Sequence, residues 1–178
     1  DTTAEDLMAV ATQANTLEKI FVCRKKIFGT IDFTTEVENA DDTLERVDTK
    51  AEEPMLIYFT SGTTGYPKAV EHNHTYTLGH IITARYWQCV KEKGLHLTVA
   101  ETGWGKASWG KIYGQWLCGC GVMVYDFDKF SPGKLLRIME RYKVTSFCAP
   151  PTVYRYFIKR GMNKYDLSAL EHLTTAGE

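Results

Sequence analysis

The stretch Tyr58-Phe59-Thr60-Ser61-Gly62-Thr63-Thr64-Gly65-Tyr66-Pro67-Lys68 is the most informative part of this chain. It follows the apolar run 55–59, which predicts a buried strand that leads directly into a loop. Glycines let a backbone approach an anion closely, hydroxyls donate hydrogen bonds to phosphate oxygens, and a lysine adds positive charge. An ordinary polar turn does not need all three together. We therefore predict a phosphate-binding loop, with Lys68 as the catalytic candidate, made of Thr60, Ser61, Gly62, Thr63, Thr64, Gly65 and Lys68.

The loop differs from the phosphate loop of Walker-type nucleotide hydrolases. That motif reads G-x-x-x-x-G-K-[ST], and its last hydroxyl binds Mg²⁺. Counted from Gly62, the second glycine position holds Pro67 and the hydroxyl position holds Ala69. Proline has no N–H to donate, and alanine cannot bind a metal ion. The sequence therefore indicates a phosphate loop of another kind.

Strands and helices alternate along the chain, which predicts an α/β fold with a largely parallel sheet flanked by helices. We expect helices over residues 6–11, 76–88, 107–117, 132–142 and 151–160. The segment 36–54 is acidic and weakly patterned, and we interpret it as loop. The strands are expected at 19–23, 55–59, 95–100, 122–125, 144–148 and 173–176.

Ligands of parallel α/β sheets gather at the carboxyl ends of the strands. Four conspicuous features follow predicted strands in this way: the phosphate loop, the turn 102–104, the pair Pro150-Pro151, and Gly177-Glu178. We expect them to meet at one edge of the sheet, where they would form a shared ligand site.

Composition narrows the class of protein. A net charge of −1 over 178 residues gives no support for a nucleic-acid surface, and no apolar run is long enough for a membrane span. The N-terminus lacks the features of a signal peptide, and the five cysteines lack a disulfide-scaffold spacing, so we predict a cytoplasmic protein. Because the chain begins with Asp1 instead of methionine, it is interpreted as an excised piece. We predict no metal site, and we interpret the charges of residues 134–143 as a solvated helix face.

Four segments resemble the adenylate-forming, or AMP-binding, superfamily. The stretch 60–68 is similar to its signature phosphate loop. The turn 101–104 is similar to the D-x-G-W segment of the acyl-CoA synthetases, with Glu101 in place of the aspartate. Residues 148–155 resemble their A-P-x-x-Y-R segment, and 176–178 the start of the G-E-P loop that contacts adenine. The best match is to the medium-chain acyl-CoA synthetases.

This resemblance implies an acid–thiol ligase that forms acyl-adenylate from a carboxylic acid and ATP and then acylates coenzyme A, in fatty acid metabolism. ATP, Mg²⁺ and coenzyme A would be its substrates, with Gly177 and Glu178 at the nucleotide. Residues 1–178 would be one fragment of the large N-terminal domain, inactive alone, without the later part of that domain and the small C-terminal domain. The sequence neither requires nor excludes a homo-oligomer. Two alternatives stay open: a non-catalytic nucleotide- or partner-binding module, and an adenylation enzyme that loads a carrier protein.

The resemblance also implies an acyl pocket. Trp104 would form its wall, although core packing is the common role of tryptophan. Gly105 stands where acetate-activating relatives carry a larger residue, which predicts a substrate bulkier than acetate. Lys106 either pairs with the substrate carboxylate or is merely solvated. The predicted pocket residues are Trp104, Gly105, Lys106, Trp109 and Cys148.

Overall fold

The computed structural model describes residues 2–23, 26–61, 65–127 and 129–176. The chain divides into two compact units, 1–48 and 49–178. In the first unit, β1 (Phe21–Val22) pairs in parallel with β2 (Ile31–Asp32), and the helices are α1 (Thr2–Ala11) and α2 (Phe33–Asn39). The interpretation of residues 36–39 as loop is wrong. Asp32 accepts a hydrogen bond from the Thr35 amide at 2.8 Å, and this N-cap starts α2 despite its acidic sequence.

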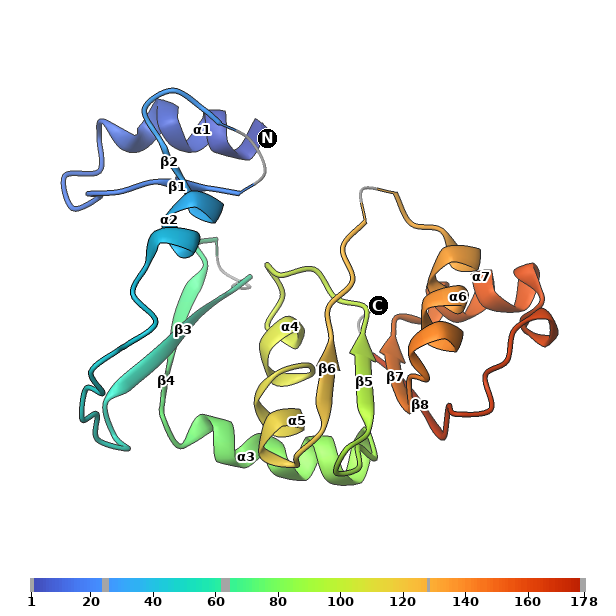
Figure 1. The fold of residues 1–178 in the computed structure, drawn as a ribbon. Helices are drawn as coiled ribbons and strands as arrows, with labels where there is room; N and C mark the ends of the chain where they lie inside the picture. The colour runs from blue at the N-terminus through green and yellow to red at the C-terminus, as the bar shows by residue number, and fades with distance from the viewer. Residues whose placement is uncertain (1, 24–25, 62–64, 128, 177–178) are drawn as a thin grey trace. The chain divides into compact units, whose positions relative to one another are not determined.

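The second unit contains a four-stranded parallel sheet (Figure 1). Its order is β6-β5-β7-β8, which confirms the predicted α/β class. Leu97 of the central strand β5 pairs with Met123 on one side and with Phe147 on the other. The strands are β5 (Leu95–Thr98), β6 (Gly121–Met123), β7 (Ser146–Ala149) and β8 (His172–Thr175).

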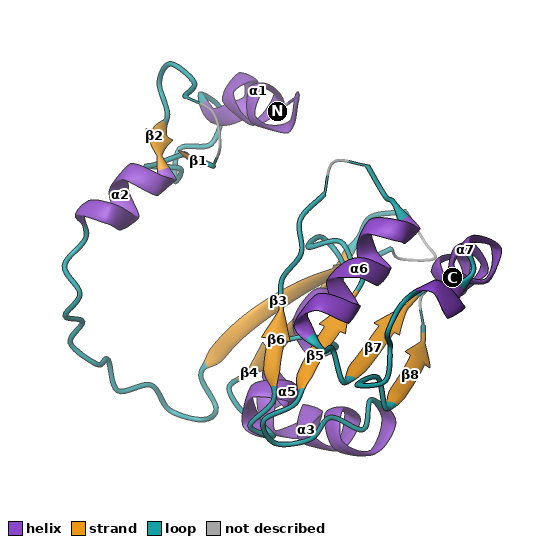
Figure 2. Ribbon diagram, turned by 45° about the vertical axis from the view of Figure 1, so that its right-hand side comes forward, coloured by secondary structure: helices purple, strands orange, loops and turns teal. Residues whose placement is uncertain are grey.

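One face of this sheet carries the apolar core. Helices α6 (Pro132–Tyr142) and α7 (Pro151–Arg160) pack against it, and Figure 2 shows α6 lying across the strands. Leu136, Phe147 and Phe157 are fully buried there. The helices begin at their predicted prolines, whose fixed φ angle suits the first turn. A short 3₁₀ turn, η2 (Met162–Lys164), follows α7.

The opposite face of the sheet is polar and equally buried. His96 shares hydrogen bonds with the Ser146 hydroxyl at 2.8 Å and with the Thr98 hydroxyl at 2.7 Å. Thr98 Oγ1 and Gln88 Nε2 both donate to the carbonyl oxygen of Gly110, each at 2.7 Å. Burial lowers the pKa of His96 to about 4, so this imidazole is neutral at physiological pH.

This polar network interrupts the helix predicted for 107–117. The structure has two short helices instead, α4 (Lys106–Trp109) and α5 (Tyr113–Leu117). The carbonyl of Gly110 accepts two side-chain hydrogen bonds, and the chain turns at this point. Upstream, α3 (Tyr76–Ile82) continues directly into the π-helical turn η1 (Thr83–Trp87). Together they confirm the helix predicted at 76–88. Where the structure describes the chain, no helix is long and apolar enough to cross a membrane.

The strand that leads into the phosphate loop lies outside the parallel sheet. β3 (Pro54–Thr60) forms an antiparallel hairpin with β4 (Lys68–Asn73). The strand predicted at 55–59 is present, but the prediction that it is buried is wrong, since Ile57 is 51% and Phe59 74% exposed. An apolar run indicates a strand, but it does not tell whether other elements cover both of its faces. Within this unit, β3 and β4 form a two-stranded ribbon, and the face of the ribbon that carries Ile57 and Phe59 is exposed to solvent.

Candidate functional site

The β3–β4 hairpin holds the two ends of the predicted phosphate loop together. Thr60 and Lys68 are paired across the ladder, and Thr60 Oγ1 donates to the Lys68 carbonyl at 3.4 Å. Gly65 has a φ of +112°, which only glycine adopts readily. Ser61, Gly65 and Lys68 are exposed, so their polar groups face solvent at the hairpin tip. The predicted phosphate-binding residues Gly62, Thr63 and Thr64 lie outside the described residues.

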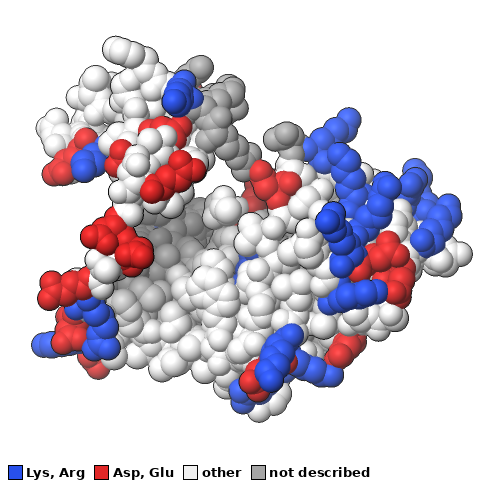
Figure 3. All heavy atoms as spheres, in the orientation of Figure 1, with Lys and Arg blue, Asp and Glu red and all other residues white. Residues whose placement is uncertain are grey.

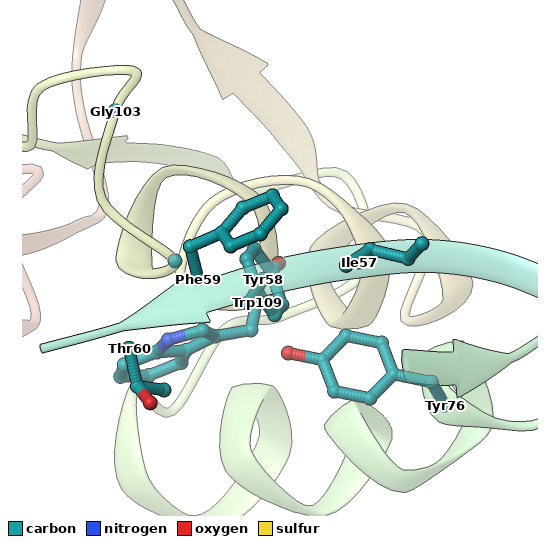
Figure 4. A pocket seen from close by; sticks show the side chains of 8 residues that line it. Ile57, Tyr58, Phe59, Thr60, Tyr76, Gly103 and Trp109 are labelled. Carbon is teal, nitrogen blue, oxygen red and sulfur yellow. The ribbon is translucent and has the colours of Figure 1, made fainter. Parts of the chain in front are cut away.

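A cavity of about 470 Å³ lies beside β3. That volume falls in the range of about 300–1,000 Å³ that is usual for small-molecule sites. Figure 4 shows β3 crossing the cavity, with Trp109 and Tyr76 on one side of the strand. The lining residues come from β3, from α3, from α4 and from the turn before α4: Ile57, Tyr58, Phe59, Thr60, Tyr76, Gly103, Gly105 and Trp109.

Aromatic contacts connect the lining residues to one another and to His80 behind them. The ring centroids of Tyr58 and Tyr76 lie 6.1 Å apart, and those of His80 and Trp109 are stacked at 5.9 Å. The Tyr58 hydroxyl makes a short hydrogen bond to the Ser108 hydroxyl. Burial, together with a hydrogen bond to Tyr58, raises the pKa of Tyr76. Burial lowers the pKa of His80, so this wall is uncharged near neutral pH and suits an apolar group.

The predicted acyl-pocket residues separate into two groups. Gly105 and Trp109 line the cavity, whereas Trp104, Lys106 and Cys148 do not. Trp104 is half exposed, and Cys148 is fully buried on β7. The lining residues that were not predicted from the sequence are Ile57, Tyr58, Phe59, Tyr76 and Gly103. One signal was available, because residues 57–59 directly precede the phosphate loop on the same strand.

Lys106 is buried and connects two parts of the predicted site. Its side chain is 5% exposed, so the interpretation as a solvated lysine is wrong. The Nζ donates to the Ala176 carbonyl at 2.8 Å and lies 5.8 Å from the centre of the Trp104 ring. Burial lowers the pKa of Lys106, while the neighbouring Cys148 raises it. Among the residues that the structure describes, no carboxylate forms an ion pair with Lys106.

Only some of the segments that follow strands meet at one edge of the sheet, as was predicted for all four. The carboxyl ends of β5, β7 and β8 lie at one edge of the parallel sheet, and the bond from Lys106 to Ala176 joins two of the segments that follow them. The phosphate loop arises from the separate hairpin. Gly177 and Glu178, predicted to contact the nucleotide, lie outside the described residues. Tyr154, whose role the sequence leaves open, donates to the Thr174 carbonyl at 2.6 Å and braces β8.

The sequence model of the AMP-binding enzymes matches residues 2–178, nearly the whole chain. The chain belongs to the AMP-binding enzyme family. Curated relatives agree. The human mitochondrial acyl-coenzyme A synthetase ACSM4 is 34% identical over 98% of this chain, and the mitochondrial ACSM3 of Pongo abelii is 33% identical over all of it. The chain spans 31% of the length of each of these two relatives.

The expected cytoplasmic location is wrong for an AMP-binding enzyme of this group, because these relatives are named as mitochondrial proteins. The sequence features used for that prediction, reduced cysteines and no signal peptide, do not separate the cytosol from the mitochondrion.

Solved structures show the same fold. The anthranilate CoA ligase AuaEII, bound to anthranoyl-AMP, superimposes on 97% of this chain with a TM-score of 0.83 and 23% identity. The acetoacetyl-CoA synthetase of Streptomyces lividans covers 98% of the chain with a TM-score of 0.81 and 22% identity. The chain corresponds to 34% and 28% of these two proteins. The architecture of the AMP-binding enzymes is therefore present in this chain, over about a third of their length.

Proposed function

We propose that this chain forms the phosphate loop and part of the acyl pocket of an AMP-forming acyl-CoA synthetase. The enzyme would join a carboxylic acid to ATP, release pyrophosphate, and pass the acyl group from the adenylate to coenzyme A. The names of the relatives and the family membership support this reaction class.

One observation carries the proposal. Thr60 lines the aromatic cavity and is also the first hydroxyl of the phosphate loop. A carboxylic acid whose apolar part fills the cavity would therefore have its carboxylate next to a nucleotide held by the loop. Holding two reactants in this way removes much of the entropic barrier to their reaction.

Formation of the adenylate would give these residues three roles. The loop hydroxyls and Lys68 would bind the β- and γ-phosphates and stabilise the charge that develops on the leaving pyrophosphate. The aromatic wall would hold the apolar tail and exclude water. The buried ammonium group of Lys106 would favour negative charge at the carboxylate or the nearby phosphates. A carboxylate oxygen then attacks the α-phosphorus, and the bond from that phosphorus to the pyrophosphate oxygen breaks.

Mg²⁺ enters this proposal with ATP, as part of the substrate. Mg²⁺ is usually bound through one or two carboxylates and the phosphates of the nucleotide. Within the described part of the chain, no three histidine, cysteine, aspartate or glutamate side chains are grouped to hold a metal ion. The described residues thus do not by themselves form a site that would hold the ion.

The direct test is carboxylate-dependent exchange of labelled pyrophosphate into ATP, with acids from acetate to octanoate and with branched and aromatic acids. We expect exchange from a longer protein that contains this chain and none from the 178 residues alone. ATP binding without exchange by the longer protein, for every acid, would instead favour a non-catalytic nucleotide-binding module. Exchange followed by transfer to a carrier protein, and not to coenzyme A, would favour the carrier-loading alternative.

Replacing Lys68 by alanine should weaken the use of ATP in that longer protein. A charge-assisted hydrogen bond is worth about 1.5–3 kcal/mol, which corresponds to a loss of roughly 10- to 150-fold in kcat/KM for ATP. Lys50 is also an exposed lysine, and its replacement by alanine is the matched control. Equal kinetics in the two variants would remove Lys68 from the phosphate site.

Replacing Gly105 by isoleucine should shorten the longest acid that is accepted. A Cβ at position 105 would lie 3.6 Å from both the Trp109 and the Tyr58 rings, which is ordinary contact, so the larger side chain would extend into the cavity. We expect the longest accepted acids to lose about tenfold or more in kcat/KM, because each excluded methylene is worth roughly 1–3 kcal/mol. Gly105→Ala should change the profile little. An unaltered chain-length preference in Gly105→Ile would show that the acyl group binds elsewhere.

A further inference from the structure

The positive charge of the chain is concentrated in one segment. Residues 129–164 contain nine lysines and arginines and a single acidic residue, Glu140. This segment therefore carries a net charge of +8, while the whole chain carries −1. Such asymmetry within one chain points to an anionic partner. The proposed phosphate loop does not account for it, because the loop lies outside this segment.

Helices α6 and α7 carry six of these nine cations on one surface, which we call the basic face. Figure 3 shows lysine and arginine side chains gathered on the side of the molecule where these two helices lie. On α6 the cations are spaced at i, i+3 and i+7, which aligns them along one stripe of the helix. The exposed cations of the basic face are Lys134, Arg137, Arg141, Arg155, Lys159 and Arg160.

Contacts between the two helices make the face continuous. Arg137 Nε donates to the Gly133 carbonyl at 3.3 Å. Arg160, on the other helix, lies against the same glycine, with its Nε 3.1 Å from the position that a Cβ on Gly133 would occupy. Arginine side chains from both helices thus lie beside Gly133. The carboxylate of Glu140, the acidic residue of this segment, accepts a hydrogen bond from the Asp166 amide at 2.8 Å.

Apolar side chains lie exposed among the cations. Ile158 is 75% exposed, and Tyr142 and Tyr156 are each about half exposed. Both tyrosine rings already have a neighbour, because Arg141 lies 5.4 Å from the centre of the Tyr142 ring and the ring centroids of Phe130 and Tyr156 lie 5.6 Å apart. These contacts would compete with the stacking of nucleic-acid bases on the same rings. An exposed aliphatic group beside lysines and arginines is instead typical of a protein surface that lies on a lipid headgroup layer.

We propose that the basic face of α6 and α7 binds an anionic membrane surface peripherally. The cations would contact lipid phosphates, and Ile158 would enter the boundary between headgroups and acyl chains. This interaction needs no membrane-spanning helix, and it is independent of the enzymatic activity proposed above.

The test is flotation of the 178-residue chain with vesicles of phosphatidylcholine alone or of three parts phosphatidylcholine to one part phosphatidylserine. We expect binding to the anionic vesicles only, and we expect it to be lost at a salt concentration of about 0.5 M, where exposed charges are screened. Removing four cations should weaken binding by roughly 1,000-fold, since each contributes on the order of 1 kcal/mol near an anionic surface. The test variant combines Lys134→Gln, Arg137→Gln, Arg141→Gln and Lys159→Gln.

A control variant removes the same amount of charge elsewhere and should bind like the parent chain. Circular dichroism of each variant checks that the fold is retained, as expected for exposed positions. Ile158→Ser should reduce vesicle binding severalfold without changing the net charge. The control combines four exposed residues outside the basic face: Lys19→Gln, Lys50→Gln, Arg85→Gln and Lys93→Gln.

Three outcomes would overturn the proposal. The first is equal binding to neutral and anionic vesicles. The second is equal loss of binding in the test and control variants. The third is tighter binding to a single-stranded oligonucleotide or to polyglutamate than to the vesicles, unaffected by Ile158→Ser, which would assign the basic face to nucleic acid or to an acidic protein. The same series in a longer protein that contains this chain must give the same order of affinities.

Discussion

Replacing Gly114 by alanine is expected to lower the free energy of unfolding of residues 49–178 by about 3 kcal/mol, the upper range for overpacking a rigid contact. A Cβ at position 114 would lie 2.2 Å from the His80 carbonyl oxygen and 2.7 Å from the Ala84 Cβ. Ala84 is completely buried, and the His80 carbonyl is helical backbone. Neither can move like the end of a flexible side chain, so α3 and α5 must separate.

Gly79 provides the matched control within α3. A Cβ there meets nothing within 4 Å, so Gly79→Ala should be neutral or should stabilise by about 0.5–1 kcal/mol through helix propensity. Urea unfolding followed by tryptophan fluorescence measures both variants. All four tryptophans lie in the second unit, so the signal reports on that unit. If Gly114→Ala and Gly79→Ala shifted the midpoint equally, the close contact of α3 with α5 would not be limiting.

Replacing Lys106 by methionine is expected to separate activity from stability. Methionine is nearly isosteric with the lysine stem but removes the buried ammonium group. Burial lowers the pKa of this lysine, which means that its charged form is disfavoured in the fold. Loss of the charge should therefore leave stability unchanged or raise it, even though the Ala176 carbonyl loses its donor.

Activity should fall in the same variant. If Lys106 stabilises the carboxylate or the nucleotide, its loss should lower kcat/KM for the acid by roughly 10- to 100-fold, the effect of removing a hydrogen bond to a charged group. Lys111 is another lysine whose pKa is lowered by burial, so Lys111→Met controls for the loss of a buried charge. Unchanged exchange activity in Lys106→Met would make this residue structural. A parallel fall of stability and activity would show that it acts through packing.

The fold class could be predicted from local sequence, and so could the position of the loop for which phosphate binding stays a prediction. The cluster of hydroxyls, two glycines and a lysine has few other uses, and the structure supports the hairpin that carries it through the positive φ of Gly65 and the Thr60–Lys68 pair. The alternation of strand and helix patterns likewise predicted the parallel sheet, because each pattern reports a periodicity of burial that short segments carry by themselves.

The composition of the cavity could not be predicted in this way. Gly105 was predicted through the resemblance, and Trp109 because it lies about one helical turn further along the chain. Tyr58 and Tyr76, in contrast, reach the same cavity from a strand and a helix that are separated in sequence. The break of the helix at Gly110 has a similar origin, because its carbonyl is used by Gln88 and Thr98 from other elements. Periodicity contains no information about such partners.

The sequence by itself thus determined the family and the order of the elements, since these depend on residues that are neighbours along the chain. Only the tertiary structure decided that β3 leaves the sheet, that Lys106 is buried against Ala176, and that the cations of α6 and α7 form one face. Those features depend on which distant segments pack together, and that choice is made by the burial of whole surfaces instead of by any local pattern.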